Sequence, residues 1–242
     1  MSNGRFRQWL LLVVMLLAPA LSGCKGQIAE LPIDVNRLSE YQAAYQADDP
    51  AGGELELRLV QSDGGLWTVH SALTAPSGEM LSEVNLRDDL MPQDSRVELR
   101  INGEEYVIAA TYGNNRLLLQ AETPTGPQSA ERNLRPPYYD NEQLLAILPA
   151  LRLEPGEPVK FVLIATQSAT KLTPSLQLMA GEGGQPLVEQ VPLAGGNVEC
   201  QMITFDAGVS GATEQTFWVT TEAPYRLAKM DNGTITYTLV ER

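Results

Sequence analysis

The sequence predicts an all-β protein in which an antiparallel meander sheet curls into an incomplete barrel or a β-sandwich. After residue 53, most of the chain consists of short runs in which apolar and polar residues alternate, separated by clusters of Gly, Pro, Asn and Asp. This pattern is typical of antiparallel strands. In the same region, one segment near the middle carries both the start and the stop signals of a helix. We therefore expect one short helix in the crossover between two β halves.

The first half is expected to contribute six strands. Its clearest turn is Asn102-Gly103, because Asn-Gly readily adopts the positive φ angles that a two-residue hairpin needs. Other turns are predicted from clusters that contain Gly, Pro or Asn. The expected strands are 54–60, 66–73, 79–86, 96–101, 104–112 and 116–121.

The crossover between the halves has two parts. Residues 123–137 break the strand pattern with Thr-Pro-Thr-Gly-Pro and Arg-Pro-Pro, and we expect them to be irregular. Asp140 then has the position of a helix N-cap, ahead of a predicted helix over 141–148 that Pro149 ends.

The second half is again predicted to be β-structure. Asp231-Asn232-Gly233 is expected to form a second hairpin turn. Because no long linker separates the halves, residues 53–242 are expected to form a single domain. The expected strands are 159–166, 175–179, 185–191, 198–205, 216–221, 225–230 and 234–240.

The N-terminus has the layout of a secretory signal peptide, with Arg5 and Arg7 ahead of an apolar run over 9–18. That run is too short to span a hydrocarbon core of about 30 Å. Leu21-Ser-Gly-Cys24 resembles the lipobox of bacterial lipoproteins at all four positions. The resemblance implies cleavage after residue 23, acyl chains (such as palmitate) on Cys24 and a membrane anchor on the extracytoplasmic face of the cell envelope. A signal peptide cleaved elsewhere is the alternative.

Residues 1–23 are thus expected to be removed, and 24–52 to form a lipidated tether. A short helix is predicted over 34–45, with Asp34 as its N-cap. Lys25 follows the lipobox Cys, where enteric-type bacteria place Asp as an inner-membrane retention signal. The resemblance therefore permits transfer to an outer membrane if the bacterium has one.

The body of the chain also resembles a known type of exported protein. The carriers of the resemblance are Tyr139-Asp-Asn-Glu-Gln-Leu-Leu145, Gly195-Gly-Asn-Val-Glu-Cys200 and Gln215-Thr-Phe-Trp-Val219. These segments are similar to an uncharacterised exported all-β family whose architecture is like that of the LolA/LolB-like incomplete β-barrels. The resemblance implies an apolar ligand groove between the curled sheet and the helix, and it implies no reaction.

His70, the only histidine, is predicted to be a surface or rim residue. Alternation along 66–73 places it on the face opposite Trp67 and Val69. No Gly-x-Ser-x-Gly elbow accompanies it, so the sequence predicts no catalytic residue. A hydrolase with two convergent carboxylates is the alternative that the sequence leaves open.

Cys200 lies on the apolar face of its strand, between Val198 and Met202. We expect it to be buried as a small hydrophobic residue, with an intermolecular disulfide as the alternative. One His and two Cys do not make a His/Cys zinc site, and no Asp-x-Asp-x-Asp-Gly calcium loop or phosphate loop occurs. We therefore expect no metal and no cofactor.

Tyr138 and Tyr139 are the predicted ligand-contact residues. They follow two prolines in the crossover, and an aromatic, Pro-rich loop at a barrel mouth would suit contact with a ligand or partner. Packing of this loop onto the helix is the alternative.

The net charge of the chain restricts the kinds of partner that it is expected to bind. The net charge is −13, and removing the leader, with its two Arg and no acid, changes it to −15. Nucleic acid is therefore not an expected partner. We expect a non-catalytic binding or carrier module for an apolar small molecule; the alternative is a structural or envelope-assembly lipoprotein that acts through protein contacts.

Overall fold

The computed structural model describes residues 28–154, 157–166, 176–180, 187–206 and 214–240. Within these ranges the chain forms one 16-stranded sheet, one α-helix and two 3₁₀-helices. The helices are η1 (Val35–Arg37), α2 (Asn141–Ile147) and η2 (Leu148–Ala150). The strands are β1 (Tyr41–Ala47), β2 (Glu54–Gln61), β3 (Trp67–Ala75), β4 (Gly78–Leu86), β5 (Pro92–Ile101), β6 (Glu104–Gly113), β7 (Arg116–Thr123), β8 (Gly126–Asn133), β9 (Tyr138–Asp140), β10 (Val159–Ile164), β11 (Leu176–Ala180), β12 (Val188–Leu193), β13 (Gly196–Asp206), β14 (Gln215–Thr220), β15 (Leu227–Asp231) and β16 (Thr236–Val240).

The sheet is a long meander that is not closed into a barrel. Its order is β8-β7-β6-β5-β4-β3-β2-β1-β16-β15-β14-β13-β11-β10-β9, and β12 pairs with the first part of β13. Only β9 and β10 pair in parallel among the described strands. The all-β class and the curled, incomplete barrel predicted from the sequence are therefore confirmed.

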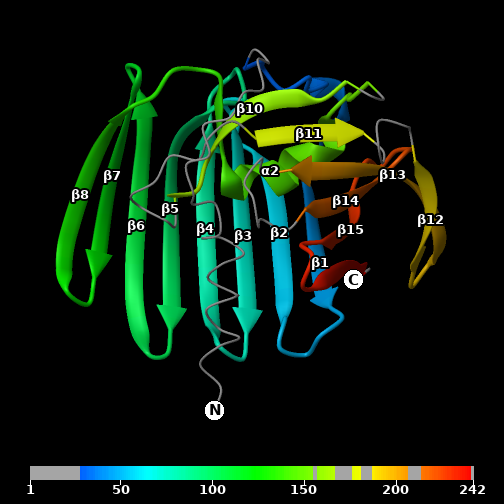
Figure 1. Cartoon of the computed structure of the whole chain (residues 1–242), viewed down its shortest axis with the longest axis horizontal. Helices are drawn as coiled ribbons and strands as arrows, with labels where there is room; N and C mark the ends of the chain where they lie inside the picture. Colours follow the sequence, from blue (N-terminus) through cyan, green and yellow to red (C-terminus); the bar gives the residue numbers. More distant parts are fainter. Residues whose placement is uncertain (1–27, 155–156, 167–175, 181–186, 207–213, 241–242) are drawn as a thin grey trace.

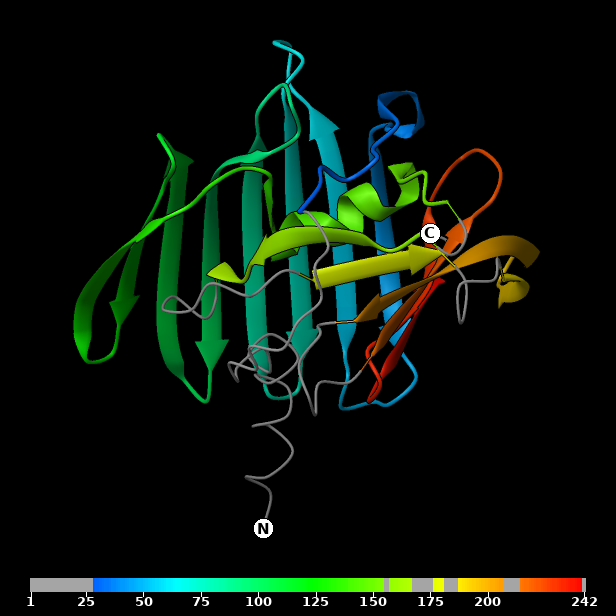
Figure 2. The ribbon, with the colours of Figure 1, turned by 45° about the horizontal axis from the view of Figure 1, so that its top comes forward.

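The sheet folds over on itself around the helix (Figures 1 and 2). Strands β1 to β8 form a tall curved wall, and β10, β11 and β13 run across its inner side. Helix α2 lies between these layers and contacts β2, β3 and β4. The largest buried core joins the wall, the helix and the crossing strands through side chains such as Leu57, Val84, Ile147 and Phe161. Each such side chain contributes about 1.5–3 kcal/mol by burial.

The predicted turns and the mid-chain helix are confirmed in place. Asn102 and Gly103 have φ angles of 53° and 82° in the β5–β6 hairpin. At the β15–β16 hairpin, the Asn232 side chain accepts hydrogen bonds from the backbone N–H groups of Thr234 and Ile235, both at 2.9 Å. The helix begins after its Asp140 cap and gives way to η2 at Leu148, next to Pro149.

The helix predicted over 34–45 is wrong. Asp34 does cap a turn, but the turn is the three-residue η1, and the chain then becomes extended at Leu38. Strand β1 follows, paired with β2 on one side and β16 on the other. Tyr45 is completely buried, so pairing and burial on both sides override the weak local helical pattern. Residues 41–47, expected in the tether, are thus part of the sheet.

The irregular segment predicted over 123–137 is also wrong in part, because it contains β8. This strand pairs along its whole length with β7. Six of its eight residues are exposed, and none of the eight is a large hydrophobic residue. The alternation that marks a strand in sequence is therefore missing there.

Candidate functional site

The candidate site is built around the start of α2. Asp140 caps the helix by accepting a hydrogen bond from the backbone N–H of Glu142 at 2.9 Å. In return, the Gln143 side chain accepts from the backbone N–H of Asp140 at 3.0 Å, which completes a capping box. Gln143 also donates to the carbonyl of Leu90 at 2.9 Å, so the helix start is tied to the loop before β5.

Asp140 is fully buried in a polar cluster that links three parts of the fold. Its carboxylate accepts hydrogen bonds from the hydroxyls of Tyr112 on β6, at 2.5 Å, and Thr166 after β10, at 2.7 Å. Ser95 on β5 contacts Thr166 at 3.1 Å. Desolvation raises the pKa of Asp140, and desolvation and the nearby carboxylate raise that of Tyr112. Each of these four polar side chains has a hydrogen-bond partner within the cluster. Because the cluster joins Asp140 to β5 and β6, it holds the start of α2 against the wall.

Glu142, two residues further on, is also buried. Its Oε2 atom lies 3.3 Å from the hydroxyls of Ser71 on β3 and Ser82 on β4, which are 2.7 Å from each other. Its Oε1 atom accepts from the Asn141 side chain at 3.1 Å. Burial, and secondarily the charge of Asp140, raise the pKa of Glu142 from 4.5 to about 7. Near pH 7 the protonated and ionised forms of this carboxyl group are therefore both populated.

A cavity of about 130 Å³ lies beside Glu142, between the wall, α2 and strands β13 to β16, which we call the returning strands. We call it the α2 cavity. Most of the described residues that line it are apolar, and none of these described residues is Lys, Arg or His. Polar lining groups come from the start of α2 with neighbouring Ser71, and from β14 and the β15–β16 turn. The lining residues are Leu55, Ser71, Leu73, Met80, Asn141, Glu142, Leu144, Leu145, Phe205, Gln215, Phe217, Met230, Asp231, Asn232 and Tyr237.

The α2 cavity lies where the sequence resemblance implies a groove, between the curled sheet and the helix. Apolar cavities of roughly 150 Å³ hold a molecule the size of benzene. The α2 cavity is therefore suited to about six carbon atoms, in contact with a carboxyl group that is itself buried.

Tyr138 and Tyr139, the predicted ligand contacts, are core residues and do not line the α2 cavity. Tyr138 stacks on Tyr112, with ring centroids 5.6 Å apart. The Tyr139 hydroxyl accepts from the backbone N–H of Leu31 at 3.0 Å, and its ring meets Phe161 edge-on. Both residues are at most 3% exposed, because β9 pairs with β10 instead of forming a loose mouth loop. The structure therefore favours the alternative, packing.

Sequence reasoning missed the polar side chains of the candidate site. Ser71 and Ser82 occupy inward positions of their strands, between Val69 and Leu73 and between Met80 and Val84. A serine where the alternation calls for an apolar residue is a signal of a buried polar network. The convergence of these serines on Glu142 depends on the register of β3 and β4 and on the docking of α2.

Cys200 is completely buried beside Met202, Trp218 and Ala228, as predicted. Burial raises the pKa of its thiol to about 11. Cys24, the predicted lipid-attachment residue, lies outside the described residues.

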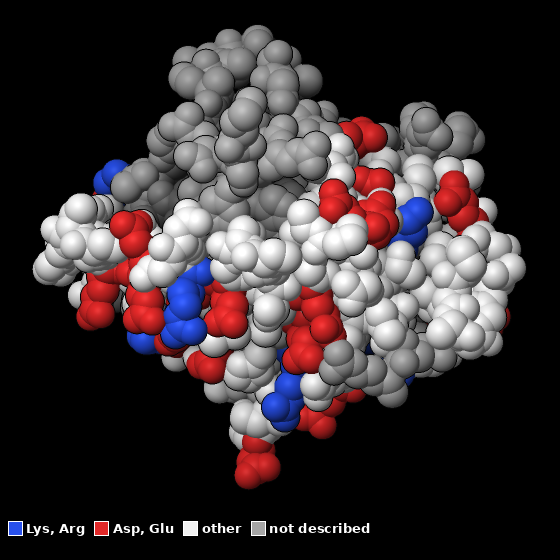
Figure 3. All heavy atoms as spheres, turned by 90° about the horizontal axis from the view of Figure 1, so that it is seen from below, with Lys and Arg blue, Asp and Glu red and all other residues white. Residues whose placement is uncertain are grey.

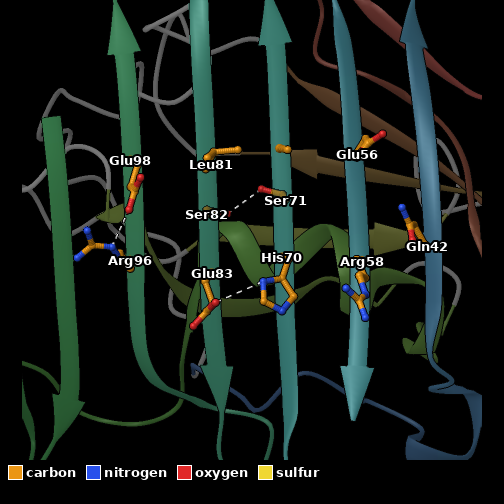
Figure 4. A pocket seen from close by; sticks show the side chains of 11 residues that line it. Gln42, Glu56, Arg58, His70, Ser71, Leu81, Ser82, Glu83, Arg96 and Glu98 are labelled. Carbon is orange, nitrogen blue, oxygen red and sulfur yellow. Dashed lines mark hydrogen bonds and ion pairs between the residues drawn. The ribbon is translucent and has the colours of Figure 1, made fainter. Parts of the chain in front are cut away.

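A second hollow, the outer groove, lies on the opposite face of the wall (Figure 4). It has a volume of about 520 Å³ and crosses β1 to β5. Two pairs of its side chains lie close together: His70 Nδ1 is 3.4 Å from Glu83 Oε2, and Arg96 Nε is 2.9 Å from Glu98 Oε1. The other lining residues that Figure 4 labels are Gln42, Glu56, Arg58, Ser71, Leu81 and Ser82.

His70 therefore has the surface position that the sequence predicts. The Ser71 hydroxyl bonds to Ser82 and Glu142 on the inner face, so the adjacent His70 and Ser71 point to opposite sides of the wall. No group of three His, Cys, Asp or Glu side chains among the described residues is arranged to hold a metal ion.

Acidic and basic side chains are interspersed on the face seen from below, with acids predominating (Figure 3). This distribution agrees with the net charge of −13. No helix within the described ranges is long and apolar enough to cross a membrane.

The fold has a solved neighbour. It is described as a "beta-barrel-like protein of domain of unknown function DUF1849" from Brucella abortus, and the two chains align with a TM-score of 0.54 at 13% sequence identity. The alignment covers 85% of this chain and 97% of that one, so the similarity extends over nearly the whole fold. No protein-family model and no curated protein matches the chain.

Proposed function

We propose that the protein is a non-catalytic, lipid-anchored module of the cell envelope that binds an apolar ligand in the α2 cavity. The observation that carries the proposal is the cavity itself, whose apolar side chains come from the wall, the helix and the returning strands. Cavities with apolar walls and few polar groups are the usual form of small-molecule sites. The lipobox resemblance at Cys24 supports the anchor, because two or three acyl chains hold a protein on a membrane stably.

Filling the α2 cavity tests ligand binding. Leu145 lines the cavity and is partly exposed, so Leu145→Trp is expected to occupy the space of a ligand. Leu118→Trp, on an exposed position of β7, is the matched control. The full chain is extracted in polymer-bounded native membrane discs, and bound small molecules are identified by mass spectrometry. We expect an apolar molecule with the wild type and with Leu118→Trp but not with Leu145→Trp. Equal small-molecule content in all three would contradict the proposal.

The anchor is tested separately by the mass of the mature N-terminus. A diacyl adduct on Cys24, lost with Cys24→Ser, is expected together with removal of residues 1–23. An unmodified Cys24 in membrane-derived protein would contradict the anchor and leave the ligand proposal standing.

The second candidate is an envelope-assembly role through protein contacts, and the position of β8 favours it. Among the described strands, β8 pairs only with β7 and ends the sheet order. A free strand edge can accept a strand from a partner. Crosslinking in cells from a photoreactive residue at Gln128 on β8 would capture a defined partner if this role holds. The same residue placed at Glu98 on β5, within the wall, is the control.

A further inference from the structure

Strand β8 lies at the far end of the wall and ends the sheet order there (Figures 1 and 2). Its register with β7 starts at the pair of Arg116 and Asn133 and continues along the whole strand. One position beyond that pair, the backbone N–H of Leu134 donates to the carbonyl of Asn115 at 2.8 Å. Hydrogen-bonded and non-hydrogen-bonded pairs alternate along an antiparallel ladder. The even-numbered residues of β8 therefore bond to β7.

The backbone N–H and C=O groups of Ser129, Glu131 and Asn133 thus point away from β7, toward the open edge. Pro127 agrees with this alternation, because a proline on an edge strand places its nitrogen on the side away from the ladder. The Arg132 side chain also lies at this edge, since its Nη1 atom donates to the carbonyl of Glu131 at 2.9 Å. Ser129, Glu131 and Asn133 are all exposed, so an incoming strand can reach their backbone groups.

The C-terminal end of this edge carries positive charge, although the chain as a whole has a net charge of −13. Arg116 on β7, Arg132 on β8 and Arg135 just after β8 are exposed. Glu131, the one acid of β8, pairs with Arg116 at 2.8 Å. Arg132 and Arg135 therefore leave the edge with an excess of positive charge, which attracts an acidic segment.

The two faces of β8 determine which side chains suit a partner strand. Arg132 and Ala130 lie opposite the buried Leu117 and Leu119 of β7, so they are on the inner side of the wall. In an antiparallel addition both would belong to non-hydrogen-bonded pairs, in which side chains come closest. An acid opposite Arg132 forms a charge pair, and an apolar residue opposite Ala130 extends the cluster of Leu117 and Leu119.

A second copy of β8 suits this edge less well. Two-fold pairing centred on Glu131 or on Arg132 sets like charges directly opposite each other, which is destabilising. Two-fold pairing centred on Ser129 or on Ala130 brings Pro127 into the new ladder, where its missing N–H leaves one hydrogen bond unmade. The edge therefore favours a strand of different sequence.

We propose that the edge of β8 binds an extended acidic segment of an envelope protein, which adds to the sheet as an antiparallel strand with a carboxylate on Arg132. Two positions after that acid, the segment carries an apolar residue opposite Ala130. Backbone hydrogen bonds to Ser129, Glu131 and Asn133 hold the strand, and the charge pair selects it. This inference goes beyond ligand binding in the α2 cavity, rests on the envelope-assembly role and adds the chemistry and orientation of the partner.

Three synthetic peptides test the proposal. The acidic peptide is Thr-Ser-Thr-Glu-Thr-Val-Thr-Ser-Thr, the second has Lys in place of Glu, and the third is the acidic peptide N-methylated at the threonines that flank Glu and Val. Each carries an uncharged fluorophore, and its binding to the full chain in dodecyl maltoside micelles is followed by fluorescence anisotropy. We expect the acidic peptide to bind about tenfold more tightly than the Lys peptide, as is typical of one charge-assisted pair. The N-methylated peptide should not bind, because it lacks the N–H groups of a strand.

Variants of the chain separate the backbone from the charge. Ser129→Pro removes one outward N–H at the type of position that Pro127 already occupies, and it should weaken binding of the acidic peptide about tenfold or more. Ser129→Thr keeps this N–H and is the matched control. Arg132→Gln should give the acidic and Lys peptides equal affinity while both still bind. Thermal unfolding checks that each variant is folded, and the N-methylated peptide tests the same hydrogen bonds with the wild-type chain.

Several outcomes would overturn the acidic strand. They are no binding of the acidic peptide, equal binding of the acidic and Lys peptides by the wild type, and binding that neither N-methylation nor Ser129→Pro weakens. A dimer of the full chain in sedimentation, lost with Ser129→Pro, would also overturn it, because a second copy would then occupy the edge. If the photoreactive residue at Gln128 still captures a defined partner, the envelope-assembly role stands without the acidic strand. If it captures none, both fail.

Discussion

At Glu142, the cost of burying a carboxyl group is set against hydrogen bonds from Ser71, Ser82 and Asn141. The Asp140 cap accepts from the backbone N–H of Glu142 and so fixes this residue at the helix start. Ionising Glu142 therefore lowers the free energy of unfolding.

The first prediction concerns the pH dependence of that stability. The pKa of Glu142 rises from 4.5 in the unfolded chain to about 7 in the folded chain, so the folded state binds the additional proton between these values. Its contribution is fully present below pH 4.5 and declines as the pH rises to 7, by up to about 3 kcal/mol. Burial shifts the pKa of Asp140 in the same direction. Glu142→Gln should therefore flatten the fall in the free energy of unfolding between pH 4.5 and 7.

Guanidinium denaturation at half-unit pH steps measures this difference. Glu98→Gln, an exposed substitution on the outer face, is the control and should follow the wild type. Parallel curves for the wild type and Glu142→Gln would show that Glu142 titrates normally.

The second residue-scale prediction concerns Cys200. Because its thiol is completely buried and its pKa is raised to about 11, almost no thiolate is exposed at neutral pH. An aromatic disulfide reagent should not react with Cys200 at pH 7.5 in the folded protein and should react with it in guanidinium. A dimer on a non-reducing gel that is lost with Cys200→Ser would contradict this burial.

At the scale of elements, the sequence predicts those strands in which apolar and polar residues alternate in the same way as buried and exposed positions. Wall strands such as β2 and β3 alternate because one face packs on the core and the other faces water. Helix α2 was predicted from Asp140 and Pro149, which act locally. The sequence does not predict β1, because the residue spacing in Tyr41-Gln-Ala-Ala-Tyr45 fits a helix as well as a strand. Only the pairing with β2 and β16 on its two sides makes this segment a strand. The α2 cavity could be expected from the resemblance, but its polar residues converge only through long-range register.

The element-scale prediction tests how α2 is held. Gln143 makes two buried hydrogen bonds, to the N–H of Asp140 and to the carbonyl of Leu90. Gln143→Ala should lower the free energy of unfolding by about 2–4 kcal/mol, because two buried backbone groups lose their partner. Gln128→Ala, on the exposed edge strand β8, is expected to change it by less than about 0.5 kcal/mol. Urea denaturation gives both values, and similar values for the two variants would mean that Gln143 does not hold the helix.

At the scale of the whole molecule, β1 joins the two halves of the sheet. β1 is the first strand of the wall and pairs with β2, the next wall strand, on one side and with β16, the last of the returning strands, on the other. The C-terminal strand is thus connected to the N-terminal half through a segment that sequence patterning assigns to a tether. The wall and the returning strands enclose the α2 cavity together, with Leu55 on one side and Tyr237 on the other.

The last prediction is that a chain starting at residue 53 does not fold, although the sequence alone places the start of the β domain there. Removing β1 exposes the edges of β2 and β16 inside the sheet and takes away Tyr45, which is completely buried. Losing the pairing on both edges and the burial of that ring removes a large part of the 5–15 kcal/mol that typically stabilises a domain. A chain starting at residue 28 retains β1 and is the matched control. Thermal unfolding followed by circular dichroism should be cooperative for the chain from 28 and absent for the chain from 53. Cooperative unfolding of the shorter chain at a similar temperature would show that the wall and the returning strands hold together without β1.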